Sequence, residues 1–426
     1  MAGKLFTNVR IFDGSGGKLF PGDVLVEGNR IKTVAKGSGE IAADGADVVD
    51  GGGATLMPGL VEAHGHLTYS NCAALKELGE IPPEEHLFVT MHNAKLLLDS
   101  GFTSVYSAAS SKPRTEIVIR NEIDAGRISG PRFKAASPEI TSTGGLGDER
   151  QLHMHHESIG IIVDGVDAMR VAVRTMIREG VDSVKINISG DHLTRPGFGE
   201  CVSFSEAEVA VAAEEAHDRG IWLSCHARAD RAIQLALKYK FRTIYHCDYA
   251  SEETMDLIEA AKDDIFLAPA IGIVYTSVYE AGAWGIDESA ASAMGMTRML
   301  EQSCKVHSEL RKRGVRILPG GDYGFAWNPN GTNARDFEHF VNLFGYTPHE
   351  VLRAATKFGG QIMGMGDELG EVKEGYLADL LLIDGDPTED VSIFQDRDNI
   401  LMIMKDGQFH KGPEPRRVRS GQVAAE

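Results

Sequence analysis

The middle of the chain, over about 300 residues, alternates short apolar runs with segments of helical periodicity. The apolar runs predict eight strands, at 59–66, 103–106, 132–137, 183–187, 222–226, 243–246, 265–270 and 317–322. Helices are predicted between them, for example at 166–179 and at 205–219, where Ser205-Glu-Ala-Glu208 forms a capping box. Eight such repeats predict the α/β class and a (β/α)8 TIM barrel, whose active site lies at the carboxyl ends of the strands.

Both ends of the chain have β character instead. Residues 23–35 contain two short strands joined at Gly28-Asn29, and the segments 375–384 and 400–409 are similar. Neither end alone can bury both faces of a sheet, so we expect one small composite β-sandwich domain. The predicted domains are the sandwich at 1–57 and 368–426 and the barrel at 58–367. The tail from Gly412 onward lacks periodicity and is expected to be loose.

Composition excludes several classes of protein. A hydrophobic content of 42% with 25% charged residues is typical of a soluble globular protein. The net charge of -19 argues against a nucleic-acid partner and against an anionic membrane. No apolar run is long enough to span a membrane, and the first residues lack the core of a signal peptide. Five scattered cysteines without a Cys-x-x-Cys motif fit a reducing cytoplasm, which is the expected location.

Six residues of metal-ligand type stand at or near the ends of predicted strands. His64 and His66 flank Gly65 at the end of the first strand, and residues at i and i+2 of a strand point to the same side. The other candidates lie on the fourth, fifth, sixth and eighth strands. Because these ends meet at one edge of a barrel, we predict one metal site formed by His64, His66, Lys185, His226, His246 and Asp322.

Lys185 is unusual because it lies within the apolar run 182–188. Burying an unpaired ammonium is costly, so this lysine must be paired, neutral or modified. A salt bridge inside the barrel is one possibility. With two metals nearby, reaction of the amine with carbon dioxide is the other, since the resulting carbamate is a carboxylate that bridges both cations.

With these residues, nearly the whole chain resembles the amidohydrolase superfamily. Pro58-Gly59-Leu60 before His64-Gly-His66 is similar to its first-strand motif, and Ala354-Ala-Thr356 and the segment 370–380 are also similar. The resemblance is strongest to prolidase-like dipeptidases and ochratoxin A-hydrolysing amidases, which are related to imidazolonepropionase. It implies that one metal is bound by His64, His66 and Asp322, that the other is bound by His226 and His246, and that carbamylated Lys185 bridges the two.

The chain departs from this family at one loop. Many relatives carry a histidine in a Gly-Gly-His-Gly context after the third strand, and this chain has Thr143-Gly-Gly-Leu146-Gly. A substrate contact by that histidine therefore cannot be transferred. His153, His155 and His156 follow a few residues later and are candidate replacements, and a solvated loop is the alternative.

The resemblance implies two divalent cations as cofactors, with zinc expected and manganese or cobalt also compatible with the ligands. Two cations lower the pKa of a shared water and supply hydroxide for attack on an amide carbonyl. Asp322 is expected to be the catalytic general base and then the general acid. Arg228, two residues after His226, is a candidate to bind a substrate carboxylate. Further candidate substrate contacts are Tyr69, Asn187, Ser189 and Tyr323.

These residues predict a carboxypeptidase-like amidohydrolase that cleaves the C-terminal amide bond of N-acyl amino acids or dipeptides. The resemblance adds ochratoxin A, a phenylalanine amide of an aromatic acid, as a candidate substrate. One alternative is a hydrolase of cyclic amides, imidazolones or other C–N bonds. A decayed barrel retained as an assembly protein is a second, and the complete ligand set disfavours it. The expected partners are a small-molecule amide and further copies of the chain.

Overall fold

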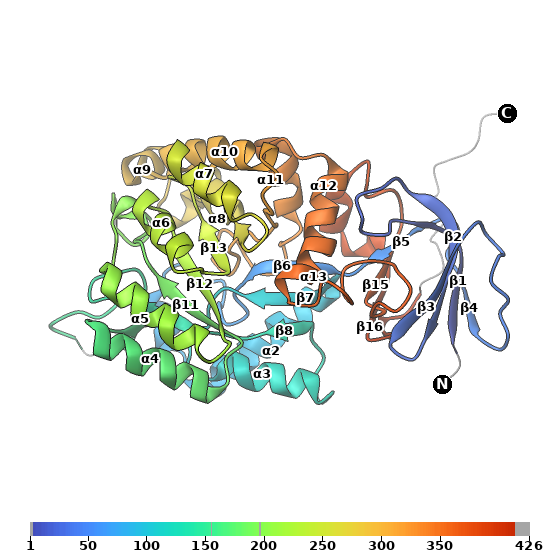
Figure 1. The fold of residues 1–426 in the computed structure, drawn as a ribbon, viewed down its shortest axis with the longest axis horizontal. Helices are drawn as coiled ribbons and strands as arrows, with labels where there is room; N and C mark the ends of the chain where they lie inside the picture. Colours follow the sequence, from blue (N-terminus) through green and yellow to red (C-terminus); the bar gives the residue numbers. More distant parts are fainter. Residues whose placement is uncertain (1–2, 155, 196, 414–426) are drawn as a thin grey trace.

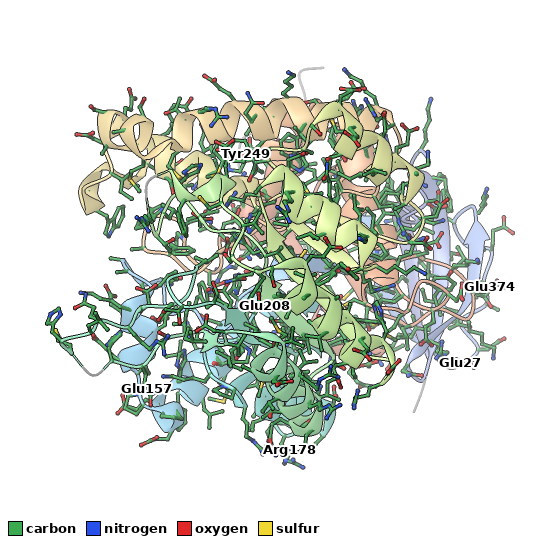
Figure 2. All side chains as sticks on the ribbon, turned by 60° about the vertical axis from the view of Figure 1, so that its left-hand side comes forward. Glu27, Glu157, Arg178, Glu208, Tyr249 and Glu374 are labelled. Carbon is green, nitrogen blue, oxygen red and sulfur yellow. The ribbon has the colours of Figure 1, made fainter. Side chains whose placement is uncertain are left out.

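The computed structural model describes residues 3–154, 156–195 and 197–413, so most of the predicted loose tail lies outside the described residues. Figure 1 shows a large part, in which helices surround a set of strands, and a smaller part made mainly of strands. Charged side chains such as Glu157, Arg178 and Glu374 project from the surface of both parts (Figure 2). In the described residues, no helix is long and apolar enough to cross a membrane.

The strands of the large part pair in parallel, and helices alternate with them along the chain. The strands are β6 (Leu60–Gly65), β7 (Phe102–Ser107), β8 (Arg132–Lys134), β9 (Ala136–Thr141), β10 (Ile161–Ile162), β11 (Ser183–Asn187), β12 (Trp222–Ala227), β13 (Thr243–His246) and β14 (Phe266–Ala268). They form a sheet in the order β6-β7-β8 and a second in the order β10-β9-β11-β12-β13-β14. The predicted α/β class is therefore confirmed.

The helices cover the outer faces of these sheets (Figure 1). They are α1 (Lys76–Glu80), α2 (Pro83–Asp99), α3 (Thr115–Asp124), α4 (Val166–Glu179), α5 (Glu206–His217), α6 (Asp230–Lys238), α7 (Glu252–Ala260), α8 (Ile271–Tyr279), α9 (Glu288–Met294), α10 (Met296–Lys312), α11 (Arg335–Phe344), α12 (Pro348–Arg353) and α13 (Gly359–Ile362). The capping box predicted at Ser205 is present, with Glu208 as its acidic member. Helix α4 has the predicted bounds.

Three predicted strands need correction. The seventh, predicted at 265–270, is limited to Phe266–Ala268, and Ala270 has a left-handed backbone with φ 60°. The third, predicted at 132–137, is two strands separated by Ala135, and β9 continues to Thr141. The eighth, predicted at 317–322, has a single bridge between Ile317 and Leu267. Regular pairing fails there because Pro319 has no N–H to donate and Asp322 has a left-handed backbone with φ 57°.

The segment around Leu318 nevertheless lies between the two sheets. Leu318 N donates to Leu267 O of β14 at 2.9 Å, and Ala63 N of β6 donates to Pro319 O at 3.4 Å. Its hydrogen bonds reach strands on both sides. Asp322 is therefore held close to the end of β6.

The arrangement of the chain ends as a β-sandwich remains a prediction, but the two ends do combine in one sheet of eight strands. These are β1 (Lys4–Ile11), β2 (Phe20–Glu27), β3 (Arg30–Lys36), β4 (Asp47–Asp50), β5 (Thr55–Pro58), β15 (Leu380–Ile383), β16 (Ile400–Lys405) and β17 (Gln408–Lys411). Their order is β17-β16-β15-β5-β1-β2-β3, with β4 beside β1. Phe6, Val24, Leu382 and Met402 share one apolar cluster of this sheet. The predicted domain boundaries remain a prediction.

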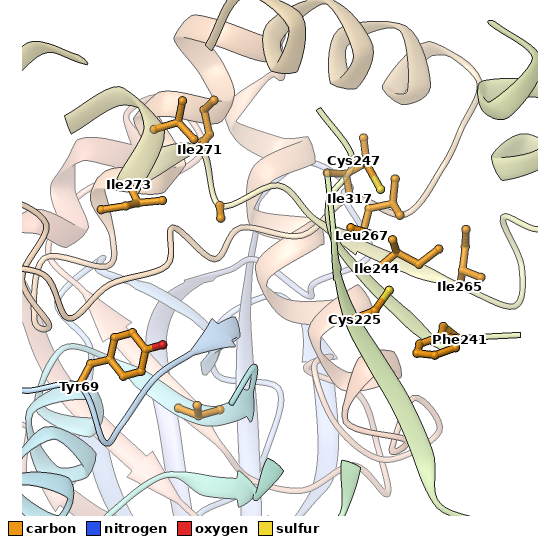
Figure 3. Close-up of a cluster of buried hydrophobic side chains, with 14 of the residues drawn as sticks. Tyr69, Cys225, Phe241, Ile244, Cys247, Ile265, Leu267, Ile271, Ile273 and Ile317 are labelled. Atoms are coloured by element: carbon orange, nitrogen blue, oxygen red, sulfur yellow. The ribbon is translucent and has the colours of Figure 1, made fainter. Parts of the chain in front are cut away.

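Side chains along the parallel strands point alternately to two faces, one in the apolar core and one that carries the polar residues. Figure 3 shows Cys225, Ile244 and Leu267 in a buried hydrophobic cluster, and each is completely buried. The residue after Cys225 is His226, which must point to the opposite face because side chains of a strand alternate. Burying each large aliphatic side chain of this cluster contributes about 1.5–3 kcal/mol. The apolar core thus fixes the strands that carry the polar residues.

We predict that Gly320→Ala destabilises the protein. An added Cβ at this position would lie 2.6 Å from the backbone nitrogen of His64. Overpacking of this kind costs about 1–3 kcal/mol, so the melting temperature measured by calorimetry should fall. Gly282→Ala is the matched control, because no atom lies within 4 Å of its added Cβ. Equal melting temperatures for the two variants would contradict the prediction.

Candidate active site

A cavity of about 380 Å³ lies at the carboxyl ends of the parallel strands. Strands β6, β11, β12 and β13 and the segment after β14 each contribute to its wall. All six residues predicted as metal ligands line it, namely His64, His66, Lys185, His226, His246 and Asp322. The structure thus brings together residues that lie up to 258 positions apart, from His64 to Asp322 (322 minus 64).

The polar atoms of these residues are close enough to share a cation. His66 Nε2 lies 3.1 Å from Asp322 Oδ1, and His64 Nε2 lies 3.9 Å from Asp322 Oδ2. One ligand atom from each of His64, His246 and Asp322 lies within 4.8 Å of the others. The rings of His226 and His246 are 4.2 Å apart between centroids. Imidazole nitrogens and a carboxylate at these separations fit the preferences of a divalent cation such as zinc.

Hydrogen bonding leaves a nitrogen available on each histidine. His66 Nδ1 donates to Ala109 O at 3.0 Å, and His226 Nε2 donates to Gly190 O at 3.0 Å, which leaves the other ring nitrogen with a lone pair. The buried Nδ1 atoms of His64 and His246 have no hydrogen-bond partner among the described residues. Unpartnered buried nitrogens are costly, so this donor set fits a bound metal.

Burial keeps His64, His226 and His246 neutral, as metal ligands must be. Burial lowers the pKa of His64 and His246 well below the usual value, and burial together with Arg228 lowers that of His226 to about 3. Burial raises the pKa of Asp322, but His64 and its neighbours outweigh that effect and hold the pKa well below its usual range. The site therefore contains neutral imidazoles and an ionised carboxylate.

The environment of Lys185 distinguishes between the two possibilities for this buried lysine. Among the described residues, no carboxylate lies within 4.0 Å of its Nζ, which stands 4.6 Å from the centre of the Tyr245 ring. Burial lowers the pKa of Lys185, although Glu139 and Asp322 oppose the shift. A lower pKa increases the fraction of neutral amine, which is the form that reacts with carbon dioxide. These contacts favour modification over a salt bridge.

Glu139 is a residue of the cavity wall that the sequence prediction missed. It is buried on β9, lines the cavity, and its Oε2 has no hydrogen-bond partner in the described part of the chain. Burial raises its pKa, and Lys185 opposes the increase. It was missed because the third strand was predicted to end at Ser137. An acid inside the run Ser137-Pro-Glu-Ile140 was the available signal.

The predicted substrate contacts separate into two groups. Tyr69 lines the cavity and stacks on His66, with 4.1 Å between ring centroids. Asn187, Ser189 and Tyr323 are buried outside the cavity wall, so the structure does not support them as contacts. Asn187 donates to Leu146 O at 3.0 Å and Ser189 accepts from the backbone N–H of Arg228 at 2.8 Å. Their polar groups support loops of the site.

Arg228 also needs correction, because its guanidinium is not available to a substrate. The side chain is 1% exposed and does not line the cavity. Its Nε lies 2.6 Å from Asp191 Oδ2, and its Nη1 lies 2.5 Å from Asp248 Oδ2. Two buried carboxylates therefore already neutralise this cation. Its partner Asp191 belongs to the loop after β11, whose conformation the sequence pattern does not reveal.

The described histidines of the loop after β9 do not reach the cavity wall. His153 is exposed and His156 is partly buried, and neither lines the cavity. His155 lies outside the described residues. Leu146, which replaces the histidine of many relatives, does line the cavity and gives this part of the wall an apolar surface.

Two residues of the site have unusual backbone conformations. His246 has φ 76° and Asp322 has φ 57°, both in the left-handed region that non-glycine residues rarely adopt. Such conformations cost about 1–3 kcal/mol each and persist where surrounding structure fixes them. The strained positions coincide with two of the proposed ligands.

We predict that Arg228→Met strongly destabilises the protein. Breaking a buried ion pair by removing one partner costs about 3–5 kcal/mol, because Asp191 and Asp248 would remain buried without a counter-charge. The variant should unfold at lower urea concentration, and adding Asp191→Asn and Asp248→Asn should restore part of the loss. Arg178→Met, at an exposed position labelled in Figure 2, is the control. Unchanged unfolding of Arg228→Met would refute the assigned role.

Comparison with known proteins agrees with this geometry. The amidohydrolase family matches residues 55–409. Ochratoxinase from Aspergillus niger is 27% identical over 333 residues, covering 74% of this chain and 67% of that protein. Imidazolonepropionase from Rubrobacter xylanophilus is 25% identical over 414 residues, covering 91% and 90% of the two chains.

Solved structures agree as well. A prolidase complexed with N-methylphosphonate-L-proline superposes with a TM-score of 0.85 at 25% identity, covering 96% of this chain and 100% of that one. The crystal structure of A. niger ochratoxinase superposes with a TM-score of 0.80 at 22% identity, covering 97% and 96%, which shows a shared fold. Together with the family match, these relatives show that the chain belongs to the amidohydrolase family and is a hydrolase acting on carbon–nitrogen bonds.

Proposed function

We propose that this protein is a binuclear metal-dependent amidohydrolase that cleaves the C-terminal amide bond of N-acyl amino acids or dipeptides. The observation that carries the proposal is the convergence of six ligand-type residues on one cavity, where, among the described residues, two imidazole nitrogens lack a hydrogen-bond partner and the buried Lys185 forms no ion pair. The likeness to an ochratoxinase and to a prolidase supports an amide bond as the target.

In this proposal the cofactors are two divalent cations, with zinc as the expected metal. His64, His66 and Asp322 would hold one cation, His226 and His246 the other, and Lys185 would bridge them as its carbamate. When bound, the cations would activate a water as nucleophile and polarise the scissile carbonyl. Four neutral imidazoles contribute no charge, so the carbamate and Asp322 would supply the anionic ligands.

Asp322 would move the proton of the reaction. Its depressed pKa keeps the carboxylate ionised at neutral pH, so it can accept a proton from the nucleophile. The amide nitrogen leaves only when protonated, and the same carboxyl group would return the proton to it. The Asp322 side chain is only 15% exposed, which limits the access of bulk water to that proton.

The cavity wall supports a substrate with bulky apolar groups. The lining includes several large apolar or aromatic side chains, among them Leu75, Leu146, Phe198, Ile286, Phe325 and Trp327. The volume of about 380 Å³ suits a small molecule. An N-acyl amino acid with an aromatic acyl group fits this wall, and ochratoxin A is a specific candidate because both sides of its amide carry aromatic rings.

We also propose a cytoplasmic homo-oligomer, with domains at 1–57 and 368–426 and at 58–367. All five cysteines are unpaired, which supports a reducing compartment. Exposed Phe88, Leu152 and Val171 support contact between copies of the chain. The negative net charge supports the absence of a nucleic-acid partner.

The proposal predicts two metal equivalents and amidase activity in enzyme purified without chelator. Elemental analysis measures the metal, and mass spectrometry identifies the products from N-benzoyl-L-phenylalanine, ochratoxin A and a panel of dipeptides. Lys185→Ala should lose the activity, and short-chain carboxylic acids should restore part of it by replacing the carbamate. Lys312→Ala, at an exposed position of α10, should behave as wild type. One equivalent or none, or no hydrolysis of any amide, would contradict the proposal.

Asp322→Asn is predicted to lower kcat by about 10²–10⁴-fold, because an amide cannot cycle a proton. Metal content should be measured on the same preparation, since the asparagine oxygen remains a possible ligand. Turnover close to that of the wild type would show that another group moves the proton.

A further inference from the structure

Arg195 is a cation of the cavity wall that forms no ion pair with any described residue. It lines the cavity together with Lys185, and its side chain is exposed to the solvent. Its guanidinium lies 5.0 Å from the centre of the Phe198 ring. Among the described residues, Arg195 forms no ion pair, whereas Arg228 is held by two carboxylates. The other charged side chains of the wall are mostly acidic. A wall arginine without an ion pair among the described residues is therefore the group that is available to bind an anionic ligand.

The loop that carries Arg195 is anchored to the active site. Asp191 Oδ1 accepts a hydrogen bond from Leu193 N at 2.8 Å. The backbone oxygen of Asp191 accepts from Thr194 Oγ1 at 3.1 Å and from Arg195 N at 3.2 Å. Asp191 Oδ2 is fixed in turn by Arg228 at 2.6 Å. The buried Arg228 therefore supports, through Asp191, the turn that carries Arg195.

We propose that Arg195 binds the carboxylate of the substrate, an assignment that rests on the proposed function. In an N-acyl amino acid the carboxylate carbon is three bonds from the scissile carbonyl carbon. Its anchor must therefore line the same cavity as the reactive centre, as Arg195 does and Arg228 does not. A guanidinium can donate two parallel hydrogen bonds to a carboxylate.

The surroundings of Arg195 favour this role. The Phe198 ring lies beside the guanidinium, within the range of a cation–π contact, and a guanidinium held in this way can still donate from its N–H groups. The same ring and its neighbours Leu193 and Ile286 line the wall and offer an apolar surface beside the charge. The substrate class that fits is an α-amino acid with a free carboxylate and an apolar side chain, acylated at nitrogen. Esters and carboxamides of the same compounds would lack the ion pair.

The test uses two ligands that the enzyme cannot hydrolyse. Both are the ketomethylene isostere of N-benzoyl-phenylalanine, in which CH₂ replaces the amide N–H, one as the free acid and one as the primary carboxamide. Calorimetry gives the dissociation constant Kd of each for the wild-type enzyme. A charge-assisted hydrogen bond is worth about tenfold in affinity at an accessible site, so the acid should bind about tenfold more tightly than the carboxamide.

Arg195→Gln should abolish this preference, and Arg195→Lys, which keeps the charge and loses the fork, should retain part of it. The control Arg178→Gln changes an exposed arginine of α4 and should leave the preference unchanged. An equal affinity of the wild type for both ligands, or a preference that survives in Arg195→Gln, would overturn the assignment. Turnover of N-benzoyl-L-phenylalanine by the wild type is measured separately, so a failure of the proposed function is distinguished from a failure at Arg195.

Discussion

Parallel strands end at the same edge of a sheet, and the side chains that follow them must therefore meet in a small volume. In this protein that volume receives four histidines, a lysine and an aspartate, and burial removes most of their water. Dehydration lowers the pKa of His64, His226, His246 and Lys185, whereas the contacts of Asp322 with His64 and His66 hold the pKa of its carboxyl group below the usual range. The chemistry of the site thus follows from where the strands end.

Two arginines near this edge show how surroundings decide the role of a residue type. Arg228 is enclosed by Asp191 and Asp248, so its guanidinium holds two strand-end loops together through these ion pairs. Arg195 stands at the surface of the cavity with an aromatic ring as its described contact. A buried guanidinium is stable only when it is paired with a carboxylate, whereas a solvated guanidinium is stable without a partner and remains available to bind a ligand. Arg228 therefore has a structural role, and the proposed role of Arg195 is to bind a ligand.

Much of this organisation was predictable from the sequence. β11 and β13 have the predicted bounds because their apolar runs are short and sharply limited. The ligand candidates were found because each stands at or near a strand end. The partners of Arg228 were not predictable, since they depend on loops whose conformation has no periodic signal. The prediction of the last strand was also wrong. Its apolar run is typical of a strand, but Pro319 and the left-handed backbone of Asp322 prevent regular pairing.

The left-handed backbone at His246 and Asp322 has a consequence for the evolution of the protein. Glycine adopts a left-handed backbone at no steric cost. Selection for thermal stability alone would therefore favour replacement of His246 and Asp322 by glycine. The imidazole and the carboxylate persist only under selection for what they bind. A lineage released from that selection should therefore lose these two side chains early, and their presence in a related sequence is a marker that the site is still in use.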